Sequence, residues 1–313
     1  MVYNRHIPVL CNEAINALNI RPDSICLDMT LGRGGHSSKI LEKIPKGHLY
    51  ATDKDINALD YSRKRLEAIA KNFTLYHLPF SKFIDELQKE GLKGADCILF
   101  DIGVSSPQFD DPSRGFSYRF DAKLDMRMNQ EQKLTAYDVV NTYSLNDLTR
   151  IIYEYGEDPS ARRIAANIVK RREIAPIETT LQLVDVIKES LPSFILNKKG
   201  HPAKQTFQAI RYEVNNEKGE LEEGLKKGID YLNVGGRLAI ITFNSLEDRI
   251  VKDLFKSYTS HPSTNRYLPD DLSLGEIKYS LVNKKPITPS QKELSINPRA
   301  LPSKLRVIER IKA

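Results

Sequence analysis

The 313-residue sequence contains no tryptophan and only three cysteines. An odd number of cysteines, without the paired spacing of a metal site, argues against both a disulfide framework and a zinc centre. Cys26 and Cys97 lie in short apolar runs, which predicts buried thiols that stay reduced. His36, His77 and His201 are widely separated in the chain, so we expect no metal site.

The sequence also lacks any apolar run of the roughly 18 residues that a membrane-spanning helix needs. Its first residues contain no long apolar stretch of the kind found in export signals. We therefore expect a cytoplasmic protein without a membrane partner. The 40% hydrophobic and 28% charged residues are ordinary for a globular protein, and the length favours two domains or one domain with a large insertion.

A glycine-rich segment at residues 28–36 lies between a short apolar run and an amphipathic one. A glycine-rich turn between a strand and a helix lets a ligand approach the backbone, and the amides at the start of the helix point at that ligand. Glycines also occur in any tight turn, so this segment alone leaves both interpretations open.

Carboxylates stand at the ends of two further apolar runs. Asp53 ends the run 48–52, about 20 residues after the glycines, which is the spacing at which Rossmann-type folds present an acid to a ribose. Asp101 ends the run 96–100 and precedes Gly103. Ligands of open α/β sheets bind at the carboxyl ends of the strands. Three such strand ends, counting the glycine-rich segment, therefore predict a nucleotide-type pocket.

Helix-like and strand-like runs alternate through residues 6–106, which predicts βαβ units and a mainly parallel sheet. Residues 109–204 instead show helical patterns broken by prolines. The alternation resumes with a long helical pattern up to residue 232, a turn at residues 233–236 and further strand-like runs. We expect an α/β domain in two parts, residues 1–108 and 207–313, with an inserted helical domain at residues 109–206.

The net charge of +6 is unevenly distributed. Residues 278–313 contain nine lysines or arginines against two glutamates, and a second basic cluster lies on a predicted helix at residues 161–172. By itself such a cluster is more typical of a solvated helix face than of a binding surface. Together with the basic tail it favours contact with the phosphates of a nucleic acid. The cluster comprises Arg162, Arg163, Lys170, Arg171 and Arg172.

A series of motifs in matching order carries a family resemblance. They are residues 30–37, 101–108, 114–117, 124–128, 201–203, 206–211, 235–237, 245–252 and 297–299. These segments closely resemble the bacterial ribosomal RNA small-subunit methyltransferase H family, also called MraW. The resemblance implies a Rossmann-like, class I S-adenosylmethionine-dependent methyltransferase fold with an inserted helical domain. It also implies methyl transfer from S-adenosylmethionine to the exocyclic N4 of a cytosine in the decoding region of 16S ribosomal RNA.

The same resemblance implies the cofactor contacts. They fall on Gly34, Gly35, His36, Asp53, Phe80, Asp101 and Gln108. The two glycines would allow close approach of the methionine moiety, Asp53 would hold the ribose, and Phe80 would cover an adenine face. Asp101 would lie beneath the positive charges of the cofactor. His36 equally suits a helix-start residue that binds no ligand.

Methylation of a cytosine amino group needs hydrogen-bond acceptors, because conjugation with the ring makes N4 a poor nucleophile. We expect these acceptors after the fourth strand, where Asp101, Ser105 and Ser106 are the candidate catalytic residues. Alignment of N4 with the methyl group would supply much of the rate enhancement without a covalent enzyme intermediate. The two serines equally suit a hydrogen-bonded turn before Pro107.

The substrate RNA is expected to contact two regions. An enzyme that acts on a base must extract it from its stack, so the helical insertion would form a second wall, with Arg163, Arg171 and Arg172 on RNA phosphates. Asn244 and Ser245 form a further polar group after a strand, although Ser245 followed by Glu247 and Asp248 favours a helix N-cap. Related sequences commonly carry a histidine where this chain has Asn244.

Other classes of function stay open on the sequence alone. An NAD-dependent oxidoreductase would use the same carboxylates, but the glycine spacing departs from the strict dinucleotide pattern. A ribosome-assembly protein could keep a cofactor pocket without turnover, and a DNA amino-methyltransferase is the nearest enzymatic alternative. The expected partner is 16S ribosomal RNA within the small subunit or its precursor, and homodimerisation is left open.

Overall fold

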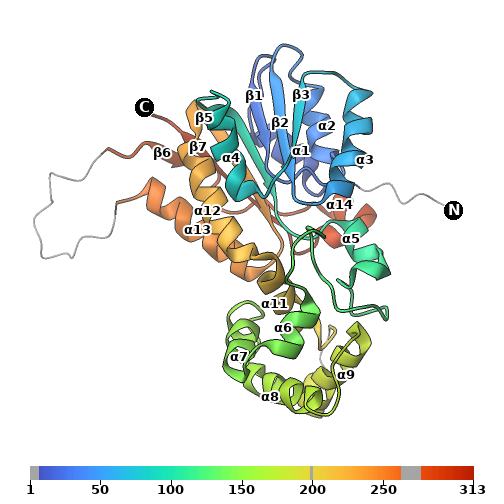
Figure 1. The fold of residues 1–313 in the computed structure, drawn as a ribbon. Helices are drawn as coiled ribbons and strands as arrows, with labels where there is room; N and C mark the ends of the chain where they lie inside the picture. The colour runs from blue at the N-terminus through green and yellow to red at the C-terminus, as the bar shows by residue number, and fades with distance from the viewer. Residues whose placement is uncertain (1–6, 198–199, 262–275) are drawn as a thin grey trace, which may run out of the picture. The chain divides into compact units, whose positions relative to one another are not determined.

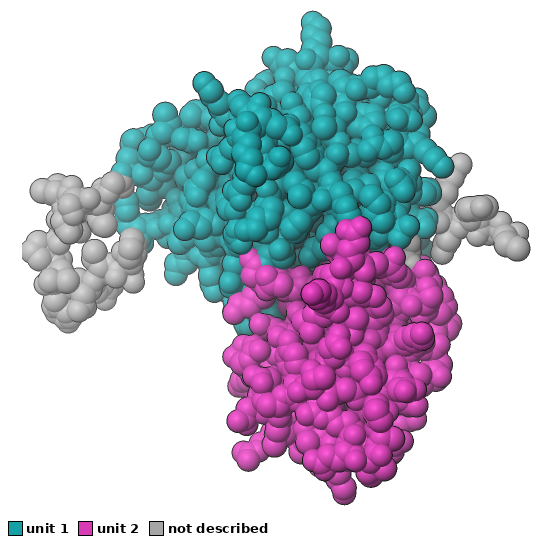
Figure 2. Space-filling view, in the orientation of Figure 1, with its two compact units in different colours: residues 1–103, 220–313 teal, residues 104–219 magenta. Residues whose placement is uncertain are grey.

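The computed structural model describes residues 7–197, 200–261 and 276–313, apart from the side chains of residues 106 and 107. The chain forms two compact units (Figure 2). The sheet unit contains residues 1–103 and 220–313, and the helical unit contains residues 104–219. The chain thus leaves the first unit once, builds the second, and returns.

The sheet unit contains a seven-stranded sheet in the order β3-β2-β1-β4-β5-β7-β6 (Figure 1). Neighbours from β3 to β5 are parallel, whereas β7 is antiparallel to both β5 and β6. The predicted Rossmann-like α/β fold is confirmed. The strands are β1 (Ile25–Asp28), β2 (His48–Asp53), β3 (Phe73–His77), β4 (Ala95–Asp101), β5 (Leu232–Thr242), β6 (Tyr279–Leu281) and β7 (Lys304–Arg310).

Helices cover both faces of this sheet (Figure 1). One face packs on α1 (Cys11–Ala17), α2 (Gly35–Leu41) and α3 (Ile56–Glu67), and the other packs on α4 (Phe80–Lys89), α12 (Glu217–Asp230) and α13 (Ser245–Thr259). Successive strand residues point to opposite faces. In β4, Cys97 and Leu99 therefore join the core under α1–α3, while Ile98 and Phe100 join the core under α4, α12 and α13.

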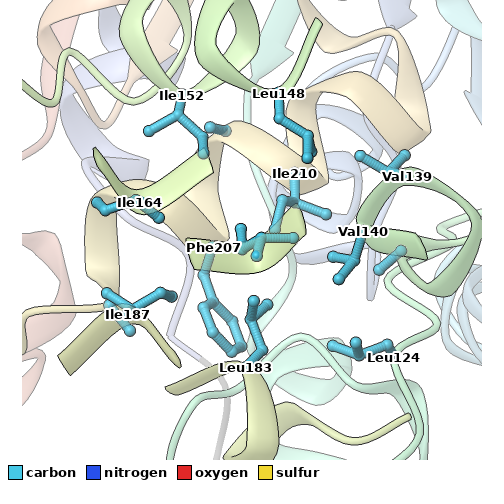
Figure 3. Packing of buried hydrophobic residues seen from close by; sticks show 14 of the residues in the cluster. Leu124, Val139, Val140, Leu148, Ile152, Ile164, Leu183, Ile187, Phe207 and Ile210 are labelled. Atoms are coloured by element: carbon cyan, nitrogen blue, oxygen red, sulfur yellow. The ribbon is translucent and has the colours of Figure 1, made fainter. Parts of the chain in front are cut away.

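The helical unit has its own hydrophobic core. Figure 3 shows Leu148, Ile164, Leu183, Phe207 and Ile210 meeting there. Capping boxes at Thr135 and Thr179 define the starts of two of its helices. The helices are α5 (Ser106–Asp110), α6 (Ala136–Thr142), α7 (Leu145–Glu154), α8 (Ala161–Arg172), α9 (Thr180–Ser190), α10 (Ser193–Leu196) and α11 (Lys204–Asn215).

The observed division differs from the expected boundaries after residues 108 and 206. Helix α11 belongs to the helical unit because Phe207, Ile210 and Val214 fill that unit's core. The expected single helix from residue 207 to residue 232 is wrong, because Asn216 adopts a left-handed conformation (φ 49°) and separates α11 from α12. Val214 and Leu221, the apolar residues on either side of this break, are about two helical turns apart, so their spacing is compatible with one continuous helix.

Two further local expectations are corrected. The expected turn at residues 233–236 lies inside β5, where the pairing with β4 shifts register between Ala95 and Cys97. Residues 286–303 have little periodicity in the sequence and are expected to form a loop, but they contain the short helix α14 (Gln291–Ile296), which begins after the N-cap Ser290. Burial is confirmed for the thiols of Cys26 and Cys97, which lie side by side on β1 and β4.

Part of the basic tail has a structural role. Lys304 and Arg306 of β7 both contact Asp248 of α13, at 2.9 Å and 2.7 Å. Arg310 donates to the carbonyl of Leu232, and Lys312 pairs with Glu276. The charge excess that suggested a nucleic-acid contact is therefore partly neutralised within the sheet unit.

Asp248→Asn should lower the free energy of unfolding by about 2–3 kcal/mol, because it leaves the largely buried guanidinium of Arg306 without its charged partner. Burial pulls the pKa of Asp248 upward, but hydrogen bonds from Arg306 and Lys304 hold it below the usual value. This stabilisation is therefore present above the ordinary aspartate pKa and lost as pH falls through the lowered one. Urea unfolding at neutral pH measures the loss; Asp253→Asn, an exposed change on the same helix, should have almost no effect.

Candidate active site

Three carboxylates stand at the carboxyl ends of adjacent strands. Asp28 ends β1, Asp53 ends β2 and Asp101 ends β4. The alternation of side chains along these strands places all three on the face that packs against α1–α3. The sheet edge therefore brings three carboxyl groups together next to the glycine loop, and the sequence predicts two of them, Asp53 and Asp101.

The glycines of this loop differ in what a side chain at their position would contact. Gly34 is the N-cap of α2 with φ 68°, a conformation that glycine adopts without strain. A Cβ on Gly35 would lie 2.5 Å from Cγ of Pro8, so this glycine makes room for the N-terminal segment, and its cofactor contact remains a prediction. At Gly32, also with positive φ, a Cβ would have no neighbour closer than 3.9 Å, which leaves the backbone there open to close approach.

Asp53 helps to shape this loop. Its Oδ2 accepts a hydrogen bond from the amide of Gly32 at 2.8 Å, and its Oδ1 accepts one from the amide of Asp55 at 2.9 Å. Burial raises the pKa of Asp53 although both hydrogen bonds favour the ionised form. A carboxylate oxygen can accept more than one hydrogen bond, so the expected ribose contact is compatible with these bonds.

The carboxyl group of Asp101 lies in surroundings that disfavour its charged form. Its backbone amide donates to Oγ1 of Thr30 at 2.7 Å, whereas its buried Oδ1 has no hydrogen-bond partner. Burial, followed by the negative charges of Asp28 and Glu247, raises the pKa of Asp101 to about 8. The side chain is still 22% exposed. A carboxyl group with one unpaired oxygen at a partly open position suits a cationic ligand, and its contact with the positive charges of the cofactor remains a prediction.

His36 lies beside Asp101 in the first turn of α2. Its Nδ1 is 3.6 Å from Oδ2 of Asp101, and its Nε2 is 3.0 Å from the carbonyl oxygen of Val9. The imidazole is only 5% exposed. It therefore connects the N-terminal segment with the carboxylate at the end of β4.

Phe80 is the first residue of α4, on the other face of the sheet. Its ring meets the ring of Phe100 edge to face, with centroids 5.6 Å apart, and a Cβ on Gly224 would lie 2.5 Å from it. These contacts fix the ring at the end of α4. The predicted adenine contact remains a prediction.

The expected acceptors beyond Asp101 belong to the helical unit. The carboxamide oxygen of Gln108 accepts a hydrogen bond from the amide of Ser105 at 3.1 Å, so Gln108 supports the start of α5. This contact agrees with the alternative of a hydrogen-bonded turn. The side chain of Ser106 lies outside the described part of the chain.

Asn244 and Ser245 introduce α13. The side chain of Asn244 accepts a hydrogen bond from the amide of Glu247, and a carboxylate oxygen of Glu247 accepts one from the amide of Phe243 at 2.7 Å. The predicted helix N-cap is confirmed at this place, but the capping residue is Asn244 and not Ser245. Ser245 is exposed as the first residue of the helix. Glu247 is buried and reaches Asp101 electrostatically, so the cap also contributes to the field of the site.

The basic cluster on α8 contains two kinds of residue. Arg163 and Arg171 are exposed. Arg172 instead donates to the carbonyls of Val140 and Tyr143 at 2.7 Å and 2.6 Å, at the C-terminal end of α6. Arg172 therefore caps a neighbouring helix, which makes it a weaker candidate for an RNA contact than the other two.

Several residues of the site did not emerge as candidates from the sequence. Asp28 is fully buried and accepts from the hydroxyl of Ser37 at 2.6 Å. Burial raises its pKa to about 6. It carries the same signal as Asp53 and Asp101, a carboxylate at a strand end, and could have been found by it. The roles of Thr30 and of the Val9 carbonyl depend on long-range packing and had no such signal.

Comparisons with known proteins point in one direction. The sequence profile of the MraW methylase family matches residues 3–311. A Fusobacterium nucleatum protein named ribosomal RNA small subunit methyltransferase H is 50% identical over 307 residues, covering 98% of this chain and 97% of its own. A Limosilactobacillus fermentum protein of the same name is 47% identical and covers 98% of both chains.

Solved structures are more distant. An rRNA methylase from Streptococcus thermophilus covers 96% of this chain and 94% of its own, with 13% identity and a TM-score of 0.42.

Among the described residues, no helix combines the length and apolarity needed to cross a bilayer. Within the same residues, no group of three or more His, Cys, Asp or Glu side chains is placed to hold a metal ion.

Asp101→Asn should stabilise the ligand-free protein at alkaline pH. The raised pKa means that the folded state holds this proton more tightly than the unfolded chain, so stability falls as pH rises from the ordinary aspartate range to about 8. The amide has no charge to desolvate, and we expect a gain on the order of 2 kcal/mol at about pH 9. Thermal unfolding of both proteins tests this. The gain should shrink at about pH 4, where Asp101 is protonated; an equal difference at both pH values would contradict the assignment.

Arg172→Gln should lower the thermal midpoint, because two helix-end carbonyls lose their donors, with a loss of about 1–2 kcal/mol. Arg171→Gln, a change of the same chemistry on the adjacent exposed position, should leave the midpoint nearly unchanged. Differential scanning calorimetry compares the two. Equal midpoints for both variants would show that the contacts of Arg172 contribute little.

Proposed function

The chain belongs to the MraW methylase family, and on that premise we propose that it methylates the exocyclic N4 of a cytosine in the decoding region of 16S ribosomal RNA. Its methyl donor is S-adenosylmethionine. The structural observation that supports this assignment most strongly is the buried Oδ1 of Asp101, which has no hydrogen-bond partner and lies among strand-end carboxyl groups, because such a position favours a cationic donor. The family match replaces the oxidoreductase interpretation.

We assign the cofactor-binding residues to different parts of the cofactor. Asp53 would accept hydrogen bonds from ribose hydroxyls, since its two oxygens keep unused acceptor capacity beside their bonds to the amides of Gly32 and Asp55. Gly32 and Gly34 form the backbone turn in front of α2, which is open to close approach at Gly32. Asp101 favours the positive end of the ligand. The bound cofactor supplies an electrophilic methyl group, and the protein contributes binding and orientation.

The cytosine amine, which is the nucleophile, must be made more reactive. The lone pair of the cytosine amine is delocalised into the ring, so acceptors that engage the amino protons make it more available. We assign this task to Asp101, Ser105 and Ser106, with Gln108 holding the segment that carries the serines. Placing the amine in line with the methyl group accounts for much of the expected acceleration. No covalent intermediate with the protein is involved.

The RNA would contact the helical unit through its exposed arginines. Arg163 lies in the first turn of α8, where a positive charge opposes the helix dipole, so helix stability does not explain its presence. Arg171 lies in the last turn, where the dipole does favour it. The substrate would be the small ribosomal subunit or its precursor, and the enzyme would act in the cytoplasm. Ser245 is a further candidate RNA contact, at the start of α13.

Purified protein should transfer labelled methyl groups to small subunits isolated from a strain that lacks this gene. It should not label subunits from the parent strain, whose target is already modified. Digestion of the labelled RNA should yield N4-methylated cytidine. Binding of S-adenosylmethionine without transfer to any ribosomal particle would instead support a non-catalytic assembly protein.

Asp53→Ala should abolish cofactor binding, which we expect to weaken by at least about 100-fold because both the ribose contact and the anchor of the Gly32 amide are lost. Isothermal titration calorimetry with S-adenosylhomocysteine measures this. Asp55→Ala is the control: it removes the N-cap of α3 and should lower the thermal midpoint while retaining binding. Unaltered affinity in Asp53→Ala would remove the ribose assignment.

A further inference from the structure

The contact between His36 and Val9 fixes the position of one proton. A carbonyl oxygen only accepts hydrogen bonds, so Nε2 of His36, 3.0 Å from the Val9 oxygen, must carry a hydrogen. The Val9 segment is held on both sides. Pro8 packs against Gly35, and the amide of Leu10 donates to Oε1 of Glu293 at 2.7 Å. The tautomer of His36 is therefore set by the fold.

The opposite ring nitrogen then faces Asp101. With Nε2 protonated, neutral His36 presents a lone pair at Nδ1 toward Oδ2 of Asp101, 3.6 Å away. Two groups without a proton between them repel each other, and two protonated groups would direct donors at one another. A single proton, on either the carboxyl group or the imidazole, makes the pair attractive.

Other charged and titratable groups around Asp101 favour retention of that proton. Asp28 faces it from β1 and Glu247 from α13, and both are buried carboxyl groups. Cys11 of α1 is coupled to Asp101 as well, and burial raises the pKa of its thiol to about 11, so it stays neutral. Among the described residues, these neighbours of Asp101 thus add negative charge or none.

We propose that Asp101 and His36 form a proton-sharing pair that holds one proton in the empty protein and releases it when a cationic sulfonium ligand binds. The proposal rests on the proposed function and identifies the charge change behind it. A positive charge near Asp101 takes over the role of the shared proton, so occupancy and protonation oppose each other. Asp101 is the group in contact with the ligand, and His36 is a positioning residue that acts through it.

The same electrostatics applies after methyl transfer. The new N–C bond forms as the S–C bond breaks, and the electron pair of the S–C bond goes to sulfur. The amine then loses one proton. Since the sulfur is then neutral, Asp101 and His36 regain their affinity for a proton. The pair therefore takes up one proton while the reaction releases one, and the product complex keeps no unbalanced charge at the end of β4.

The test is proton linkage measured by calorimetry in buffers of different ionisation enthalpy, with S-adenosylmethionine and with S-adenosylhomocysteine. At about pH 7, below the raised pKa of Asp101, binding of the sulfonium ligand should release up to about one proton, and the neutral thioether should release clearly fewer. The affinity ratio of the two ligands should rise with pH up to about 8 and then level off. This comparison uses only the unaltered protein.

Two variants separate positioning from simple packing. His36→Asn should shift the midpoint of proton release to lower pH, because Asp101 loses the partner that helps it keep the proton. His48→Asn, a change at a histidine bonded to Thr74 in the same sheet unit, should leave the midpoint in place. Equal proton release by both ligands, or an unchanged midpoint in His36→Asn, would overturn the pair while leaving the proposed function intact. If neither ligand binds, the proposed function itself fails.

Discussion

The site depends on one energetic constraint: a carboxylate at the end of β4 is kept largely buried, next to two other acids, with one oxygen that accepts no hydrogen bond. Such a group costs free energy in the empty protein, because burial penalises its charged form. The cost is offset when a cation occupies the site. The same feature that weakens the fold therefore strengthens the binding of a sulfonium ligand, a trade that is common at functional sites.

The remainder of the sheet unit keeps this constraint in place. Thr30 accepts from the amide of Asp101, Asp53 holds the amide of Gly32, and Gly35 makes room for Pro8. Through Leu10 and Glu293, the N-terminal segment is attached to α14 near the other end of the chain. This part of the site is thus assembled from segments near both ends of the chain and from three strand ends.

Structural features that follow a short-range pattern along the chain are predicted well from the sequence. The alternation of strands and helices and the carboxylates Asp53 and Asp101 at strand ends were visible without a structure, because each depends on short-range periodicity. The break at Asn216 was not visible, since the apolar spacing across it is compatible with one continuous helix. Nor was the capping contact of Arg172 with α6, because it joins residues about 30 positions apart. Charge counting could not distinguish Arg306, which pairs with Asp248, from a residue that awaits a phosphate.

The most direct test of the account is mass-spectrometric mapping of modified nucleosides in 16S ribosomal RNA from cells with and without this gene. The account predicts that one cytosine of the decoding region loses its N4-methyl group when the gene is deleted, and regains it when the unaltered gene is returned but not when the Asp101→Asn gene is returned. An identical pattern of modified cytosines in the presence and absence of the gene would contradict it.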